Sequence, residues 1–341
     1  MTNTAQGMLK NFLSIVDRFG FIPNGGRIYY SMRSQPPLLT PMVKTFVDHT
    51  SNREFAISVV DTLAREFDYW IANHTMIVKG HRLARYGDKS SGPRPESYRE
   101  DVETGKDFPT AEEREEHYAE LKAAAESGMD FSSRWFVNKD GTNEGDLRNL
   151  KTRSIIPVEL NAILYWNAKI IAEFYGYKGD TAKQAEYQKR SAEFMLAVDE
   201  VLWNEEAGAW LDYDTINDKP RPYFVPTNLS PLWMRCYSPT KRQHIADRIV
   251  QYINNTKIDD YPGGVPTTLV DSGEQWDWPN VWAPMQHILI VGLDNLDDER
   301  TKRIAQSWAQ RWVQGNYLAF QDTGAMFEKV KFVEHSLENF H

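Results

Sequence analysis

Long segments of the chain carry apolar residues at the 3.6-residue period of an α-helix. The segment from Pro157 to Tyr177 opens with a proline and ends shortly before Gly179, and these residues favour a helix start and a helix end. Strand signals are few, the best being the short stretch Trp210–Tyr213. The pattern predicts an all-α fold with helices over about residues 8–20, 61–72, 111–126, 157–177, 181–203, 239–254, 281–293 and 297–317.

The connections between these helices are of two kinds. The link from Gly176 to Asp180 joins two long helices almost directly, whereas other connections are long and rich in Gly, Pro, Arg, Asp and Trp. Such alternation favours helical hairpins arranged as a toroid with the long loops at one end, and a two-layer helical bundle is the alternative. No linker composition interrupts the chain, so we expect a single domain over residues 1–341. The long loops are 20–37, 77–109, 128–153, 204–230, 258–280 and 321–341.

Two helical segments have a distinct charge pattern. The segment Ala111–Glu126 is strongly acidic, which predicts a helix with solvent-exposed sides. The run Asp297-Asp298-Glu299-Arg300 could be compared with an acidic metal motif of a terpene cyclase, but it fits a helix N-cap and an acidic first turn better.

Composition argues against several classes of protein. Hydrophobic residues make up 41% of the chain, which is enough for a large core, and the single Cys236 rules out a disulfide framework. The net charge is −9 without a Lys/Arg cluster, which argues against nucleic acid as a partner. The histidines are scattered and no nucleotide-binding fingerprint occurs, so we expect no metal and no cofactor. No signal peptide is visible, and the sequence predicts neither compartment nor oligomeric state.

Aromatic residues are abundant, at 13% with 11 Trp, and one loop concentrates them. Between Asp271 and Pro284, Trp276 and Trp282 are interleaved with hydrogen-bonding residues such as Gln275. Polar groups beside apolar ring faces are what recognition of a polyol requires. A Trp-rich corner of the core is the alternative.

Two further loops offer charged groups on constrained backbone. In the first, the turn around Asn24 is followed by Arg33 and Gln35. In the second, two prolines flank Arg94 and precede Glu96. These residues are candidates for binding a polar ligand; the alternatives are a solvated surface turn for the first loop and local ion pairs for the second.

A third loop contains the best candidate for acid–base chemistry. Asp130 lies between Met129 and Phe131, and apolar surroundings raise the pKa of a carboxyl toward the range that a general acid needs. The alternative is that Asp130 is a helix N-cap. Because no nucleophile motif or metal site is visible, carboxylate chemistry is the mechanism that the sequence favours.

Several segments together resemble the trehalases of glycoside hydrolase family 37. The segment Gln275–Pro284 resembles the signature QWDxPxGWAP, with Val281 in place of its glycine. The resemblance extends from about Gly7 to Lys329, with the segments in the family's order. The other matching segments are Pro23–Pro37, Arg94–Ser97, Glu126–Trp135 and Ile155–Ala162.

The resemblance implies an (α/α)6 barrel that hydrolyses the disaccharide α,α-trehalose to two glucose molecules with inversion and without a cofactor. It implies that Asp130 is the general acid and that Glu328, in the segment Met326–Lys329, is the general base. Inversion requires the two carboxyl groups to lie about 6.5–9.5 Å apart. The substrate-binding residues that it implies are Asn24, Arg33, Gln35, Arg94, Glu96, Gly128, Gln275, Trp276 and Trp282.

The chain departs from the family's pattern at both ends. The upstream signature PGGRFxExYxWDSY is missing, and so is the glycine-rich lid GGGGEYxxQxGFGWTNG after the base. We therefore expect a truncated, incomplete barrel that releases glucose weakly or not at all. A non-catalytic carbohydrate-binding remnant of a trehalase is the alternative.

Overall fold

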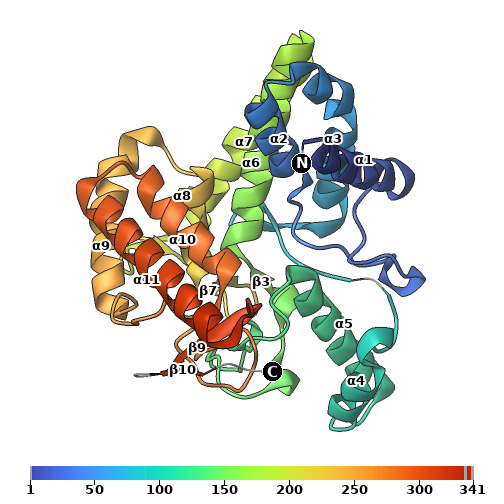
Figure 1. Ribbon diagram of the computed structural model, residues 1–341. Helices are drawn as coiled ribbons and strands as arrows, with labels where there is room; N and C mark the ends of the chain where they lie inside the picture. The colour runs from blue at the N-terminus through green and yellow to red at the C-terminus, as the bar shows by residue number, and fades with distance from the viewer. Residues whose placement is uncertain (1, 89, 334–335, 339–341) are drawn as a thin grey trace. The chain divides into compact units, whose positions relative to one another are not determined.

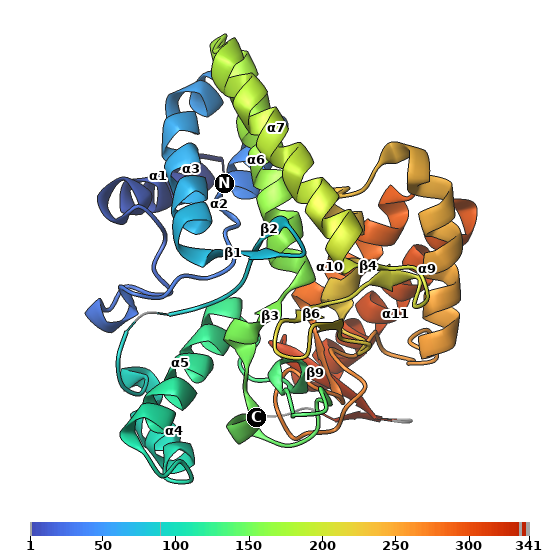
Figure 2. The same ribbon diagram turned by 180° about the vertical axis from the view of Figure 1, so that it is seen from behind.

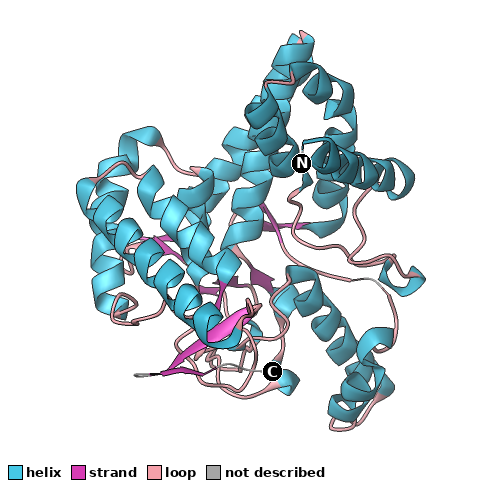
Figure 3. Ribbon diagram, in the orientation of Figure 1, coloured by secondary structure: helices cyan, strands magenta, loops and turns pink. Residues whose placement is uncertain are grey.

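The computed structural model describes residues 2–88, 90–333 and 336–338, and most of them are helical (Figures 1 and 3). This result confirms the predicted all-α class. The helices are α1 (Thr2–Phe19), α2 (Leu39–Thr50), α3 (Arg53–His74), α4 (Tyr98–Gly105), α5 (Ala111–Ser127), α6 (Val158–Lys178), α7 (Thr181–Ala197), α8 (Ser230–Met234), α9 (Arg242–Thr256), α10 (Ala283–Asn295) and α11 (Glu299–Thr323).

The strands are short and antiparallel. They form two hairpins, β1–β2 and β4–β5, and two three-stranded sheets with the orders β10-β9-β8 and β3-β6-β7. Residues 334–335 and 339–341 of the predicted final loop lie outside the described residues. The strands are β1 (Thr75–Val78), β2 (His81–Ala84), β3 (Ile155–Ile156), β4 (Trp203–Asn204), β5 (Ala209–Trp210), β6 (Tyr213–Asp214), β7 (Lys219–Pro220), β8 (Asn280–Trp282), β9 (Lys329–Val333) and β10 (Ser336–Glu338).

Helix ends follow the local signals that the sequence carries. Helix α1 stops where Gly20 adopts a left-handed φ of 84° and donates its N–H to the Val16 carbonyl over 2.7 Å. The Asp180 carboxylate accepts the Lys183 N–H over 3.0 Å at the start of α7. At α11 the cap is Asp298, which accepts from the N–H groups of Arg300 and Thr301. The acidic run there is a helix start, as predicted.

Some elements were not predicted. Helix α2 begins at Leu39 without a side-chain cap, because its N-cap residue is Leu38, and so the sequence carries no start signal there. The loop expected over residues 77–109 contains the strand β2 and the helix α4. The predicted strand Trp210–Tyr213 is divided between β5 and β6.

The described chain forms two compact units, one made of Met1–Gly128 and Leu160–Ala197, the other of Met129–Glu159 and Val198–His341. In the first unit α1, α2 and α3 pack together, and α6 and α7 run side by side (Figure 2). Aromatic rings join α3 to α7, where Phe67 contacts Tyr187 and Phe194. Trp70 and Phe67 are among the fully buried side chains of this unit.

In the second unit, α10 packs against both α8 and α11 (Figure 1). Strand β8 leads directly into α10 and pairs with β9, so that Trp282 lies opposite Lys329. The sheet therefore connects the Trp-rich loop before α10 to the chain that follows α11. None of the helices in the described ranges is long and apolar enough to cross a membrane.

The expectation that the acidic helix α5 is solvent-exposed is wrong. Its first two turns are exposed, but from His117 onward most side chains are buried, including those of Glu120 and Glu126. The buried part reaches the end of the helix, where Gly128 has a φ of 76° and donates its N–H to the Ala125 carbonyl over 3.2 Å. The acidic composition therefore predicts solvent exposure correctly only for the first half of α5.

Candidate active site

Three of the predicted binding residues meet in the first unit. Arg33 is only 4% exposed; its Nε donates to Asn24 Oδ1 over 2.9 Å, and its Nη2 forms an ion pair with Glu96 Oε1. The Asn24 N–H also donates to the Arg33 carbonyl over 2.7 Å. Arg33 is therefore not the solvated surface arginine of the alternative interpretation.

The other binding candidates of this unit have different surroundings. Gln35 donates through Nε2 to the Ala125 carbonyl over 2.9 Å. A Cβ at Gly128 would lie 3.0 Å from Gln35 Oε1, so glycine there leaves room for this amide. The guanidinium of Arg94 is paired with Asp101, with Nη2 2.7 Å from Oδ1. A local ion pair thus holds Arg94, as its alternative interpretation predicted.

A buried carboxyl that was not predicted lies beneath the Arg33 loop. Glu126, at the end of α5, accepts the N–H of Ser34 and the N–H of Gly87, each over 2.8 Å. Its side chain is fully buried. Burial raises the pKa of Glu126 to about 8, although the two N–H donors and the Arg33 charge act in the opposite direction. Glu126 therefore fixes the backbone between Arg33 and Gln35.

In the second unit, the carbonyl groups of the Asp130 loop are held one after another. Trp135 Nε1 donates to the Met129 carbonyl over 3.0 Å, Gln275 Nε2 donates to the Asp130 carbonyl over 2.5 Å, and the Trp276 N–H donates to the Phe131 carbonyl over 3.0 Å. The cap of the following short helix is Ser132, whose side chain accepts the Arg134 N–H. The N-cap alternative for Asp130 is therefore wrong.

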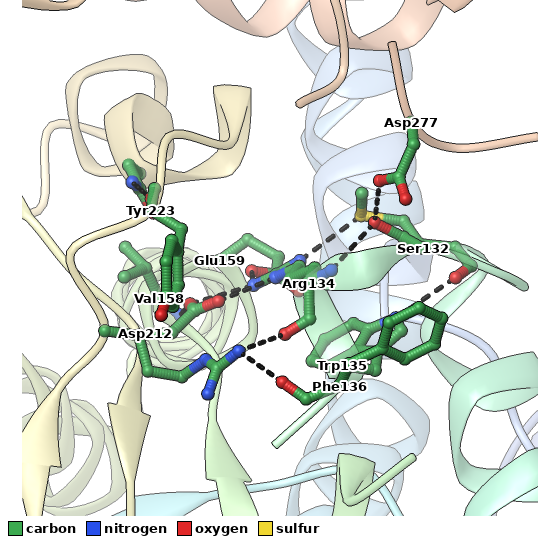
Figure 4. Close-up of polar contacts among 12 residues, drawn as sticks. Ser132, Arg134, Trp135, Phe136, Val158, Glu159, Asp212, Tyr223 and Asp277 are labelled. Atoms are coloured by element: carbon green, nitrogen blue, oxygen red, sulfur yellow. Dashed lines mark hydrogen bonds and ion pairs between the residues drawn. The ribbon is translucent and has the colours of Figure 1, made fainter. Parts of the chain in front are cut away.

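Asp277 anchors the same loop and was also missed. Its buried carboxylate accepts the Ser132 hydroxyl over 2.7 Å (Figure 4). It also accepts the Ser133 N–H over 2.7 Å. It further accepts Thr268 Oγ1 over 2.9 Å and the Ser272 hydroxyl. One carboxylate therefore receives four donors and joins the Asp130 loop to the Trp-rich loop.

A buried arginine secures the far end of the Asp130 loop. Arg134 donates to Asp212 from Nε over 2.7 Å and to Glu159 from Nη2 over 2.5 Å (Figure 4). These two carboxylates raise the pKa of Arg134 despite its burial. Arg221 donates to the carbonyl groups of Arg134 and Phe136 over 3.1 and 2.8 Å. Buried hydrogen bonds and ion pairs therefore hold the loop that carries Asp130 on both sides.

The two tryptophans assigned to sugar binding stack on each other. The rings of Trp276 and Trp282 are 3.9 Å apart and nearly parallel, and these residues are 8% and 6% exposed. Lys329 Nζ lies 5.2 Å from the centroid of the Trp282 ring. These contacts resemble the Trp-rich corner of the alternative interpretation and leave little ring face for a ligand.

Glu328, the candidate base, lies at an exposed position directly before β9. The next residue, Lys329, donates from Nζ to Gln275 Oε1 over 3.2 Å. The same Gln275 side chain donates to the Asp130 carbonyl. The two candidate catalytic residues therefore belong to segments that a single amide joins. Across the described ranges, no group of three or more His, Cys, Asp or Glu side chains could hold a metal ion.

Comparison with known proteins shows the family of the chain. The family model described as Trehalase matches residues 1–338. The chain belongs to the trehalase family. It is 51% identical over 333 residues to the trehalase of Apis mellifera and 41% identical over 333 residues to that of Homo sapiens, covering 96% of this chain in each case. It covers 53% and 56% of those relatives, and thus spans about half their length.

Solved structures confirm the fold class. The neutral trehalase Nth1 from Saccharomyces cerevisiae superimposes with a TM-score of 0.79 at 21% identity, covering 98% of this chain and 65% of that one. A GH63 mannosylglycerate hydrolase from Thermus thermophilus gives a TM-score of 0.58 at 15% identity, covering 90% of this chain and 71% of that one. At these identities the likeness shows a shared helical fold.

Proposed function

We propose that this trehalase-family chain carries the catalytic pair of an enzyme that hydrolyses α,α-trehalose to two glucose molecules with inversion. Curated relatives at 41–51% identity are named trehalase. The observation that carries the assignment of residues is the Gln275 side chain, which contacts both the Asp130 carbonyl and Lys329, the neighbour of Glu328. An acid and a base on segments joined in this way suit a reaction that needs two carboxyl groups.

In the proposed reaction, protonated Asp130 gives its proton to the oxygen that bridges the two sugars. The bond from that oxygen to one anomeric carbon breaks, and a water molecule attacks this carbon from the opposite face. Ionised Glu328 takes a proton from the water. One glucose leaves with its original anomeric configuration, and the other carries the inverted centre.

The remaining predicted residues would bind sugar hydroxyls. Arg33, Arg94 and Gln35 supply N–H donors, and Glu96 supplies a carboxylate acceptor. The ion pair of Arg33 with Glu96 supports this role because it holds both charged groups in fixed positions. Asn24 and Gly128 would shape the backbone beside them. Trp276 and Trp282 would contribute only through their ring edges, because their faces are stacked.

The stereochemistry of the products tests this proposal. Trehalose contains two α-linked glucoses, and only one anomeric bond is broken. Inversion therefore gives α- and β-glucose in equal initial amounts, whereas retention gives α-glucose alone. We expect proton NMR of the purified chain with trehalose to record the equal ratio before mutarotation, and Asp130→Asn to slow glucose release by about 10²- to 10⁴-fold.

Initial production of α-glucose alone, or unchanged activity in Asp130→Asn, would contradict the proposal. Calorimetry separates it from the carbohydrate-binding alternative. Trehalose binding without any turnover by the wild-type chain would favour a binding remnant.

A further inference from the structure

The Gln275 side chain uses both ends of its amide within the protein, although the residue is exposed. Nε2 donates to the Asp130 carbonyl over 2.5 Å, and Oε1 accepts from Lys329 Nζ over 3.2 Å. The Gln275 carbonyl also accepts from Trp282 Nε1 over 2.9 Å. An exposed glutamine bound at three atoms is ordered by its neighbours rather than left to solvent.

Lys329 is fixed from a second direction. Strand β9 pairs with β8 so that Lys329 lies opposite Trp282, and its ammonium lies 5.2 Å from the Trp282 ring centroid. A cation over an indole ring is held by the ring's electron distribution. Gln275, Trp282 and Lys329 therefore form a closed set of contacts, which we call the clasp.

The clasp is continuous with the backbone of both candidate catalytic residues. On one side it contacts the carbonyl of Asp130 itself, and the stacked Trp276 donates its N–H to the Phe131 carbonyl over 3.0 Å. On the other side, Lys329 follows Glu328 directly in the chain. Moving Lys329 therefore moves Glu328, and releasing Gln275 removes its hydrogen bond to the Asp130 carbonyl.

We propose that Gln275 and Lys329 are positioning residues that set the placement of Glu328 relative to Asp130. This inference rests on the proposed function and assigns Gln275 a role other than the substrate contact that the sequence suggested. Inversion depends on the separation of the two carboxyl groups, because a water molecule must fit between the base and the sugar. Neither positioning residue needs to touch the substrate for its loss to slow the reaction.

Steady-state kinetics of clasp variants test the proposal. We expect Lys329→Met and Gln275→Leu each to lower kcat on trehalose by about 10- to 100-fold with KM changed less than about 3-fold, because misplacement of a catalytic group by about 1 Å costs that much. The double variant should be no slower than the slower single variant. Lys329→Arg should recover most of the rate, because a guanidinium can donate to Gln275 and cover the ring.

The matched control is Lys331→Met, which removes the same charge from the same strand but lies outside the clasp. We expect it to keep kcat within about 2-fold of wild type. A raised KM with unchanged kcat in Gln275→Leu would overturn the proposal in favour of a substrate contact. Additive losses in the double variant, or equal losses in Lys331→Met, would overturn it as well.

A second readout does not depend on activity. If the wild-type chain releases no glucose from trehalose, the proposed function fails. Hydrogen exchange then still tests whether the clasp contacts hold the two loops together. The amides of Ser133 and Trp276 are hydrogen-bonded between the two loops. They should exchange faster in Lys329→Met than in wild type and in Lys331→Met. Equal exchange in all three proteins would overturn the clasp.

Discussion

Among single residues, Asp277 shows how the second unit fixes the Asp130 loop. Its carboxylate is excluded from solvent and accepts donors from Ser132, Ser133, Thr268 and Ser272. A buried carboxylate with four donors is stable because its lost hydration is replaced by hydrogen bonds. The sequence places Asp277 between two tryptophans of the signature, but only the structure identifies these donors.

Replacing Asp277 by Asn should therefore loosen this loop. The amide keeps the shape but offers one acceptor atom, and its NH2 group faces donors such as the Ser133 N–H. We expect the free energy of unfolding, measured by urea denaturation, to fall by about 1–3 kcal/mol.

Ser133→Ala is the matched control. Ser133 contacts Asp277 through its backbone N–H, and its buried hydroxyl has no hydrogen-bond partner within the described part of the chain. The free energy of unfolding of Ser133→Ala should therefore stay close to that of the wild-type protein. Equal losses in Asp277→Asn and Ser133→Ala would show that the carboxylate is not the anchor.

Among the elements, α5 and α6 show where sequence-based prediction succeeds and where it fails. The start of α6 after Pro157 and the end before Gly179 follow from local backbone preferences, so they were predicted. Burial of the second half of α5 depends on distant partners, such as the backbone of Ser34 and Gly87 that Glu126 binds. Composition alone cannot indicate such contacts, and so the sequence predicts solvent exposure for all of α5.

Prediction of the candidate site from the sequence also succeeded only in part. The sequence identified Asp130, Arg33 and Glu96 as functional candidates, since their segments resemble family blocks, and the structure pairs Arg33 with Glu96. The sequence could not indicate that Trp276 and Trp282 stack on each other, because the orientation of such rings depends on tertiary packing. The roles of Asp130 and Glu328 remain predictions.

Helix α3 carries a buried carboxyl, Glu66, whose titration should make stability depend on pH. Glu66 is 2% exposed, its Oε2 has no hydrogen-bond partner within the described residues, and burial raises its pKa to about 8. The folded state therefore keeps a proton that the unfolded chain loses above its ordinary pKa of about 4.5. Stability from this group falls as pH rises from about 4.5 to 8, by about 1.4 kcal/mol per pH unit.

Glu66→Gln removes this titration while keeping the shape. We expect its Tm to match wild type near pH 5 and to exceed it by several degrees near pH 8. Glu54→Gln, in the exposed first turn of the same helix, should show no such pH-dependent gain. A Tm difference that is the same at both pH values would contradict the assignment of the raised pKa to Glu66.

For the whole molecule, the all-α class follows from helical periodicity, and the TM-score of 0.79 with yeast neutral trehalase shows which helical fold it is. The periodicity could not choose between a toroid and a bundle, because that choice depends on packing between helices distant in sequence. A single domain over the chain remains a prediction.

The central functional claim is that Asp130 and Glu328 act as acid and base on one glycosidic bond.

Hydrolysis of α-glucosyl fluoride tests this claim most directly, because fluoride leaves without a proton from the enzyme. If Asp130 is the acid and Glu328 the base, Asp130→Asn should lose trehalose hydrolysis by about 10²- to 10⁴-fold yet keep most of its fluoride release, and Glu328→Gln should lose both. Equal loss of fluoride release in the two variants, or trehalose hydrolysis that survives Glu328→Gln, would contradict the account.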